Sequence, residues 1–202
     1  MKKKYINFMF NFSAIVGQDN AKLALLVAAV DKGIGGVLLS GVKGTGKSTI
    51  VRGFASVLPE LDVVDGCRFN CISGDESNLC SECRARDGRP AVKRKAEIIT
   101  VPLGTTQDRL LGSIDMEKAM KTGDIEFKPG LLARANHQRL YFDHFNLMPD
   151  HIADNILDAS ASGEATVQRE GISVTHPARF TLVGTMNPEE GQLRPQILDR
   201  FA

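Results

Sequence analysis

The sequence predicts an α/β fold in which helices flank a parallel β-sheet. A glycine-rich segment, residues 41–48, stands between a short apolar run and a stretch of helical character. Four short, mostly apolar segments have the composition of buried parallel strands, and helical segments alternate with them along the chain. With 202 residues, of which 43% are hydrophobic, the chain is long enough to bury one core of this kind.

Each element follows from a local signal. An apolar helical face that closes at Gly33 predicts the first helix. Pro59 stops the helix after the glycine-rich segment, and Pro149 and Gly163 bracket a later one. Two short β-prone runs around a turn at residues 169–171 predict an inserted β-hairpin. The expected elements are a helix at 21–29, a strand at 36–40, a helix at 49–58, strands at 97–101 and 139–143, a helix at 149–162, a hairpin at 166–174 and a strand at 180–185.

The glycine-rich segment has the pattern of a phosphate-binding loop. Glycines let the backbone curl until several N–H groups point at phosphate oxygens, and the N-terminus of the next helix adds partial positive charge. Lys47 is placed to reach the β- and γ-phosphates of ATP, and the Ser48 hydroxyl to ligate the accompanying Mg²⁺. A glycine-rich turn without a role is the alternative, but the flanking strand and helix favour the loop. The candidate nucleotide-binding residues here are Gly41, Val42, Lys43, Gly44, Thr45, Gly46, Lys47, Ser48 and Thr49.

Two further polar residues follow apolar strands. Asp143 is the candidate to hold magnesium at the tip of a strand near the loop; the alternative is an aspartate that caps the next helix. Asn187 is the candidate to orient the attacking water near the γ-phosphate, although Asn-Pro also commonly starts a turn. These residues predict a P-loop nucleoside triphosphatase core.

All four cysteines fall within residues 66–90, a loop expected between the helix after the phosphate loop and the second core strand. Their spacing is C-x₃-C-x₈-C-x₂-C, with Cys67, Cys71, Cys80 and Cys83 as members. In a cytosolic chain such paired spacings favour a thiolate metal site over structural disulfides. Zn²⁺ and an iron–sulfur cluster both suit four thiolates, and redox disulfides and unliganded thiols stay open as alternatives.

Composition argues against two classes of partner. The formal net charge of +1 gives no support to nucleic-acid binding or to an acidic membrane surface. The N-terminal basic and apolar run, residues 1–10, lacks the cleavage site of a secretory signal, so we expect a cytoplasmic protein.

The short basic run Lys93, Arg94 and Lys95 is expected to form a solvated loop. His137, His151 and His176 have no ligand-like spacing and are expected to be structural or surface residues.

Several motifs together resemble the small ATPase subunit of magnesium chelatase, an AAA+ ATPase, over essentially the whole chain. They are the phosphate loop and residues 15–18, 127–132, 171–180, 183–191 and 193–201. The resemblance implies a single AAA+ domain over residues 1–202, assembly into a homo-oligomeric ring, and ATP-driven remodelling that inserts a metal ion into a tetrapyrrole. The implied partners are a second AAA+ subunit with an integrin-type domain and a large tetrapyrrole-binding subunit.

The resemblance also implies roles for individual residues. Val16 and Gly17 are expected near the adenine, and Asn187 is expected to sense the γ-phosphate. Arg200 is expected to act as an arginine finger that reaches a neighbouring subunit's ATP, with Asp199 orienting it. A surface Asp-Arg pair of little effect is the alternative.

The chain departs from the family pattern in two places. His144 stands where the family has a glutamate that orients the attacking water, and the chain stops at Ala202, before the family's helical lid. A neutral imidazole can accept a proton but lacks the carboxylate's charge. We therefore expect ATP binding with slow hydrolysis, in a fragment or in a natural chain without its lid. The alternatives are a nucleotide-gated binding subunit and an AAA+ chaperone that remodels a metalloenzyme.

Overall fold

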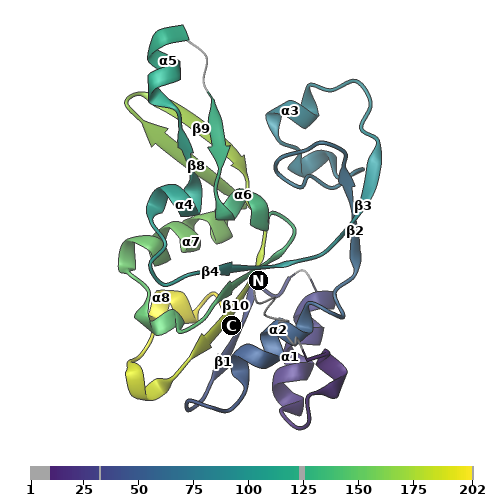
Figure 1. The fold of residues 1–202 in the computed structure, drawn as a ribbon, viewed down its shortest axis with the longest axis vertical. Helices are drawn as coiled ribbons and strands as arrows, with labels where there is room; N and C mark the ends of the chain where they lie inside the picture. Colours follow the sequence, from purple (N-terminus) through teal and green to yellow (C-terminus); the bar gives the residue numbers. More distant parts are fainter. Residues whose placement is uncertain (1–9, 32, 123–125, 202) are drawn as a thin grey trace, which may run out of the picture.

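A computed structural model describes residues 10–31, 33–122 and 126–201 (Figure 1). Most of the N-terminal basic and apolar run, as well as Ala202, lies outside the described residues. The centre of the fold is a parallel sheet in the order β1-β10-β7-β4, which confirms the predicted α/β class. Its strands are β1 (Gly36–Ser40), β4 (Ile98–Val101), β7 (Arg139–Phe142) and β10 (Thr181–Met186).

The strand order brings the phosphate loop and two other strand ends to one edge. Because the strands are parallel, their carboxyl ends lie at the same side of the sheet. β10 lies between β1, which leads into the loop, and β7, which leads to Asp143. Asn187, directly after β10, is therefore placed between the loop and Asp143.

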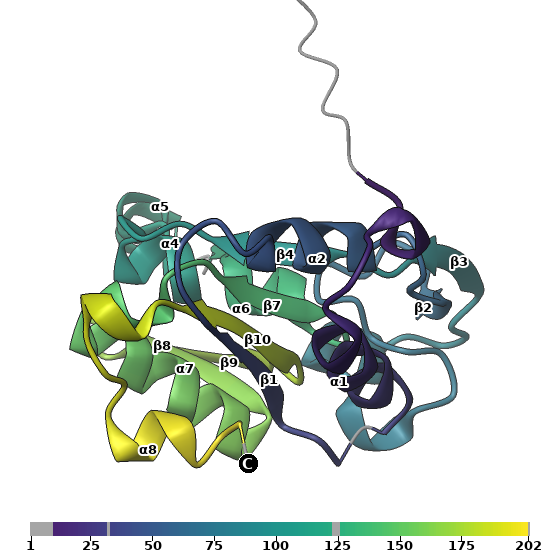
Figure 2. The same ribbon diagram turned by 90° about the horizontal axis from the view of Figure 1, so that it is seen from below.

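Both faces of the sheet are covered, as the apolar strand sequences predict. On one face, Val37, Tyr141 and Val183 pack with residues of α1 (Asp19–Val30) and α2 (Lys47–Phe54). On the other, Leu140 and Leu182 belong to a second core, which includes residues of α7 (Asp150–Ser162). Figure 2 shows the two sets of helices on opposite sides of the strands. All four residues of β7 are buried, as expected for a strand that is covered on both faces.

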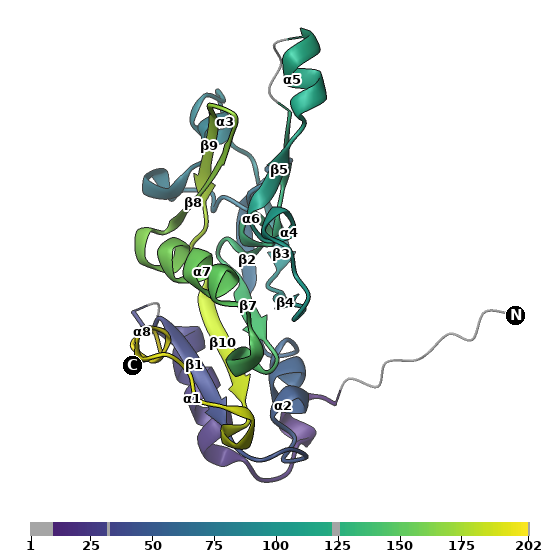
Figure 3. The same ribbon diagram turned by 90° about the vertical axis from the view of Figure 1, so that its left-hand side faces the viewer.

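Two hairpins project from the end of the molecule that is opposite the phosphate loop (Figures 1 and 3). The pair β8 (Glu164–Arg169) and β9 (Ile172–Pro177) confirms the predicted hairpin. The pair β5 (Gly112–Ile114) and β6 (Phe127–Pro129) was not predicted, and α5 (Met116–Thr122) follows β5. The remaining short helices are α3 (Ser81–Arg84), α4 (Gln107–Leu111), α6 (Leu131–Ala135) and α8 (Pro195–Leu198), and the 3₁₀ turns are Phe12–Ala14, Glu76–Asn78, Phe145–Leu147 and Pro188–Glu190.

The basic run at residues 93–95 corrects one expectation, because it forms part of a strand and not a loop. β3 (Ala91–Lys95) pairs antiparallel with β2 (Glu60–Val64), and the register sets Lys95 opposite Glu60 and Lys93 opposite Asp62. Opposite charges in facing positions stabilise such a pair. The cysteine-bearing segment therefore connects β2 to β3, ahead of the second core strand β4.

The helix after the phosphate loop is shorter than predicted. It begins at Lys47, inside the loop, and ends at Phe54, four residues before the predicted end. Residues 55–57 continue as turns before Pro59. Across the described ranges, no helix combines the length and apolar character that a membrane crossing requires.

Candidate nucleotide-binding site

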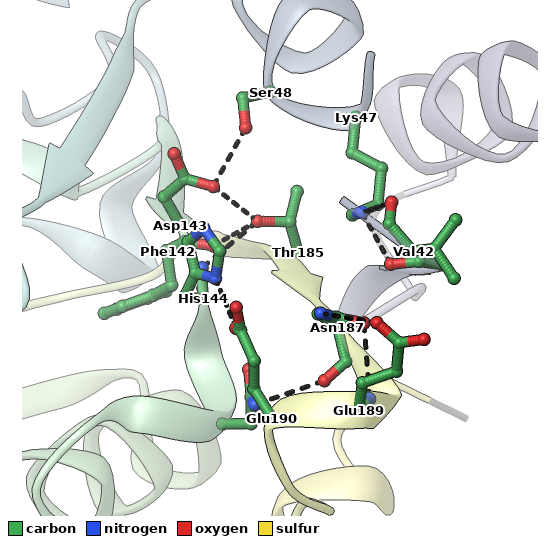
Figure 4. A network of polar contacts seen from close by, with 12 residues as sticks. Val42, Lys47, Ser48, Phe142, Asp143, His144, Thr185, Asn187, Glu189 and Glu190 are labelled. Carbon is green, nitrogen blue, oxygen red and sulfur yellow. Dashed lines mark hydrogen bonds and ion pairs between the residues drawn. The ribbon is translucent and has the colours of Figure 1, made fainter. Parts of the chain in front are cut away.

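The phosphate loop has the backbone conformation that its glycines predict. Gly44 and Gly46 have φ angles of 87° and 82°, in the left-handed region where glycine is favoured, and Gly46 caps the N-terminus of α2. The Lys47 ammonium folds onto the loop, where Nζ donates to the carbonyl oxygens of Gly41 at 2.6 Å and Val42 at 2.8 Å (Figure 4). The ammonium is thereby held at the mouth of the loop, where the phosphate oxygens of a bound nucleotide would compete with these two carbonyls for its N–H groups.

Asp143 lies directly against the loop. Its Oδ1 accepts hydrogen bonds from the Ser48 hydroxyl at 2.9 Å and from the Thr185 hydroxyl at 2.8 Å (Figure 4). Burial opposes ionisation of this half-buried carboxyl, but the hydrogen bonds from Thr185 and Ser48 outweigh it and lower the pKa of Asp143. The carboxylate is therefore the dominant form at neutral pH. The structure thus brings together two oxygen donors that the sequence places 95 positions apart.

His144 is held beside the same edge of the sheet by two contacts. Its backbone, with φ of 57°, is left-handed, and its N–H donates to the Thr185 hydroxyl at 3.2 Å. Its Nδ1 lies 2.8 Å from Oε2 of Glu190. The hydrogen bond with His144 is the main cause of a lowered pKa at Glu190. An imidazole in contact with a carboxylate is a pair that can hold and move a proton.

Asn187 is buried at the end of β10 and is fixed by its own turn. Its side-chain oxygen accepts from the Glu189 N–H at 3.2 Å, and its backbone carbonyl accepts from the Glu190 N–H at 3.0 Å. A pocket joins these groups to the loop. It is lined by residues 43–49, Asp143, His144 and residues 185–187. The pocket thus contains the predicted phosphate, magnesium and water-orienting residues together.

The predicted adenine segment lies next to the loop. Gly17 and Gln18 both have positive φ angles, of 73° and 58°, and the Gln18 side-chain amide donates to the Thr45 carbonyl at 3.0 Å. The Val16 side chain is 96% exposed and leaves an apolar surface beside this bridge. A second hollow, lined by Gln18, residues of α1 and residues 37–41, continues from the loop at this place.

Arg200 is not part of the pocket of its own chain. Its backbone carbonyl lies beside Gly35, at the start of β1, whereas the phosphate loop follows the end of β1. The length of that strand, roughly 16 Å, separates the two. Arg200 and Asp199 are both exposed, and within the described residues no ion pair joins them. The expected orienting role of Asp199 thus stays a prediction without a contact to support it.

The four cysteines form a compact, buried cluster at the other end of the molecule. All four are free thiols, and their sulfur atoms lie within 4.8 Å of one another. Sulfur contacts from Cys71 and Cys80 lower the pKa of Cys67, whereas the contact from Cys67 raises the pKa of Cys71. Burial raises the pKa of Cys83 to about 12.

Two residues of the site were missed by sequence reasoning. Thr185 is 1% exposed, donates to Asp143 and accepts from the His144 N–H. It lies in the predicted strand at 180–185 and in the motif at residues 183–191, but nothing in the local pattern marks its hydroxyl. Glu190 lies three residues after Asn187, and its contact with His144 depends on a turn. An acidic residue so close to Asn187 was the one available signal.

The fold and the pocket together define a P-loop nucleotide-binding protein of the AAA+ class. A family model described as magnesium chelatase, subunit ChlI, matches residues 11–92 and 113–195. The chain belongs to this family. The similarity covers the phosphate loop, the cysteine cluster, Asp143 and Asn187.

Individual relatives agree with this assignment. The magnesium-chelatase subunit ChlI of Synechocystis is 52% identical over 197 residues, which cover 96% of this chain and 55% of the relative. The magnesium-chelatase subunit ChlI homolog of Methanocaldococcus jannaschii is 50% identical, over 97% of this chain and 54% of the relative. A solved structure, described as a complex between subunits BchI and BchD of magnesium chelatase, matches with a TM-score of 0.77 and 50% identity, over 96% of this chain and 59% of that one. The chain spans about half the length of the curated relatives it matches.

Proposed function

We propose that this chain is the nucleotide-binding core of an ATPase motor subunit in a magnesium-chelatase-like complex, which drives metal insertion into a tetrapyrrole. The observation that carries this proposal is the contact between the Ser48 hydroxyl and Asp143, 2.9 Å, beside Lys47 in one pocket. A strand-end carboxylate against a phosphate loop is the arrangement that P-loop nucleoside triphosphatases use. Family membership and the relatives' names supply the biological context.

The residues present fit a magnesium–nucleotide complex. Ser48 and Asp143 present hard oxygen donors, and the hydrogen bonds to Asp143 favour its ionised form, as Mg²⁺ requires. We assign Ser48 and Asp143 to magnesium, Lys47 and the backbone of residues 41–49 to the phosphates, and Val16 and Gly17 to the adenine. When bound, the metal would offset charge on the phosphate oxygens.

For hydrolysis, we propose that His144, Glu190 and Asn187 replace the usual carboxylate at this edge of the sheet. Asn187 would orient the water, and His144 would accept its proton while Glu190 holds the imidazole through Nδ1. A neutral imidazole lacks the charge of a glutamate directly after Asp143, so turnover is slow. The same observation favours one second candidate function, a nucleotide-gated binding subunit with little turnover. A chaperone for another metalloenzyme is not favoured by the family match.

We further propose assembly into a homo-oligomeric ring, with a second AAA+ subunit and a large tetrapyrrole-binding subunit as partners. The supporting observation in this chain is that Arg200 is exposed and lies at the far end of β1 from its own phosphate loop. The relative of known structure is itself described as a complex of two chelatase subunits.

Calorimetric titration with Mg·ATP, followed by a turnover assay on the same samples, tests the proposal. Lys47→Ala should lose measurable ATP binding, because the phosphate-facing cation is removed, whereas the exposed Lys93→Ala should bind as wild type does. His144→Glu should hydrolyse ATP faster than wild type, and Glu190→Gln more slowly. Undiminished binding by Lys47→Ala would refute the nucleotide site. Equal turnover in wild type and His144→Glu would refute the proposal of slow hydrolysis but would not affect the proposed nucleotide site.

A further inference from the structure

The cysteine cluster is a built site that the nucleotide chemistry does not use. We propose that Cys67, Cys71, Cys80 and Cys83 bind one Zn²⁺ ion, which fastens the segment between β2 and β3 to the hairpin end of the molecule. Each of the four cysteines is at most 6% exposed. The segment that carries them, with α3, lies at the end of the molecule opposite the phosphate loop (Figure 1). The inference is independent of the proposed ATPase activity.

The spacing of the sulfur atoms fits a single tetrahedral ion. In a four-thiolate zinc site with Zn–S bonds of about 2.3 Å, the sulfurs lie about 3.8 Å apart. Here the Cys67 and Cys80 sulfurs are 3.9 Å apart, and all four lie within 4.8 Å of one another. A disulfide needs about 2.05 Å between its two sulfurs, and all four thiols are free here. Iron–sulfur clusters place bridging sulfides between their irons, so their thiolates spread more widely than these do.

The backbone around the cluster is arranged to stabilise negative charge on sulfur. Backbone N–H groups donate to three of the thiol sulfurs: Phe69 to Cys67 at 3.3 Å, Cys80 to Cys71 at 3.2 Å, and Cys83 to Cys80 at 3.4 Å. Ligand-bound thiolates need such partners, because four of them carry more negative charge than one divalent ion offsets. Four buried thiols without a metal would gain little from this arrangement.

The residues between the first two cysteines connect the cluster to the rest of the molecule. Phe69 stacks on His176 of β9 at 5.3 Å between centroids and on Phe127 of β6 at 6.2 Å. Its carbonyl accepts from the Asn136 side chain at 2.7 Å, and the Asn70 side chain donates to the Arg134 carbonyl at 2.9 Å. An ion that fixes Cys67 and Cys71 therefore also fixes the contacts that Phe69 makes with both hairpins.

A single ion explains why this segment can fold at all. Between β2 and β3 the described residues contain one four-residue helix and one 3₁₀ turn, which alone give little stability. Structural zinc contributes folding free energy directly in such small, loop-rich units. The residues that the segment contributes to the hydrophobic core are the four cysteines, Phe69 and Leu79.

Elemental analysis of the full wild-type chain is the first test. The chain is purified from cells supplied with both zinc and iron and is dialysed against a weak chelator. We expect about one zinc per chain, reduced at least tenfold in Cys83→Ser and unchanged in the matched neighbour Ser81→Ala. X-ray absorption at the zinc edge should show a shell of sulfur ligands only. Iron with acid-labile sulfide, a disulfide, or four titratable thiols in metal-free protein would each overturn the proposal.

A second measurement uses wild type alone and so does not depend on whether a cysteine variant folds. Zinc is removed with a strong chelator and then restored, while amide hydrogen exchange is followed. We expect faster exchange in residues 66–84 and at Phe127 without zinc, with protection regained when zinc is added, and little change in α1 or α2. Exchange that is indifferent to zinc would refute the fastening role even if zinc is bound.

Discussion

At the scale of single residues, the hydroxyl of Thr185 organises the candidate site, although nothing in the sequence assigns it a role. It donates to Asp143 at 2.8 Å and accepts from the His144 N–H at 3.2 Å. Asp143 and His144 leave the end of β7 in different directions, and Thr185 on the neighbouring β10 contacts both. Its burial excludes water that could replace either bond.

Thr185→Val should therefore weaken Mg·ATP binding by about tenfold or more, because a hydrogen bond to a charged group contributes roughly 1.5–3 kcal/mol. Valine keeps the shape of the side chain, but the hydrogen bond to the Asp143 carboxylate and the one from the His144 N–H are both lost. Calorimetric titration with Mg·ATP measures the effect. Thr100→Val, an exposed position in β4, is the matched control and should bind as wild type does. Equal affinities for the two variants would contradict the role of the hydroxyl.

The sequence predicted the positions of most functional groups better than their contacts. Lys47, Ser48, Asp143 and Asn187 follow strands in a fixed order, so parallel pairing alone brings them to one edge. The contact between His144 and Glu190 depends on the left-handed backbone at residue 144 and on the turn after Asn187. Neither conformation is encoded by residue type, since histidine only sometimes adopts positive φ.

At the scale of elements, strands buried on both faces were predictable and charged strands were not. β1, β4, β7 and β10 are runs of apolar residues between turn signals, and each lies within one or two residues of its predicted bounds. β3 has all five residues exposed, so its sequence carries no apolar alternation, and two of its five pairs with β2 are of opposite charge. Such a strand depends on its pairing with β2, and a local sequence pattern carries no information about a pairing partner elsewhere in the chain.

The close approach of two elements at Gly130 yields a stability prediction. A Cβ added there would lie 2.5 Å from the Leu110 carbonyl oxygen and 2.6 Å from the carbonyl carbon of Leu111, both backbone atoms of α4. Gly130→Ala must therefore shift α4 or α6, and we expect it to lower the free energy of unfolding by about 3 kcal/mol. Gly104→Ala, where a Cβ meets nothing within 4 Å, should change it by less than about 0.5 kcal/mol. Urea unfolding of both variants makes the comparison, and similar midpoints would rule out the close packing.

At the scale of the whole molecule, His176 links the hairpins to the β2–β3 segment and should make stability depend on pH. It is 2% exposed, and its ring nitrogens face the carbonyls of Leu111 and Pro177. Burial lowers the pKa of His176 below the ordinary 6.5, although the two carbonyls oppose this shift. The folded chain therefore binds a proton less readily than the unfolded chain does.

The sign of the effect follows from this difference. Above pH 6.5 the imidazole is neutral in both states, and below it the unfolded chain takes up the proton first, so stability falls as pH decreases. Urea unfolding between pH 7.5 and pH 5 should show a shallower loss for His176→Gln than for wild type. His151→Gln, at an exposed position, should follow wild type. Taking differences at each pH removes the contributions of other titrating groups, and parallel curves for all three proteins would count against a buried neutral His176.

Assembly gives the last prediction. The Arg200 backbone lies beside the start of β1, and the phosphate loop of the same chain follows the end of that strand, roughly 16 Å away. If Arg200 completes a neighbour's site, Arg200→Ala should bind ATP normally and lose turnover by roughly 10³–10⁵-fold, whereas Gln196→Ala on the same exposed stretch should be unaffected. Lys47→Ala lacks nucleotide but retains Arg200, so mixing it with Arg200→Ala should restore part of the turnover, which neither variant has alone. A finger acting within its own chain would leave the mixture as inactive as its components. ATP hydrolysis as a function of mixing ratio therefore tests directly whether the site is shared between subunits.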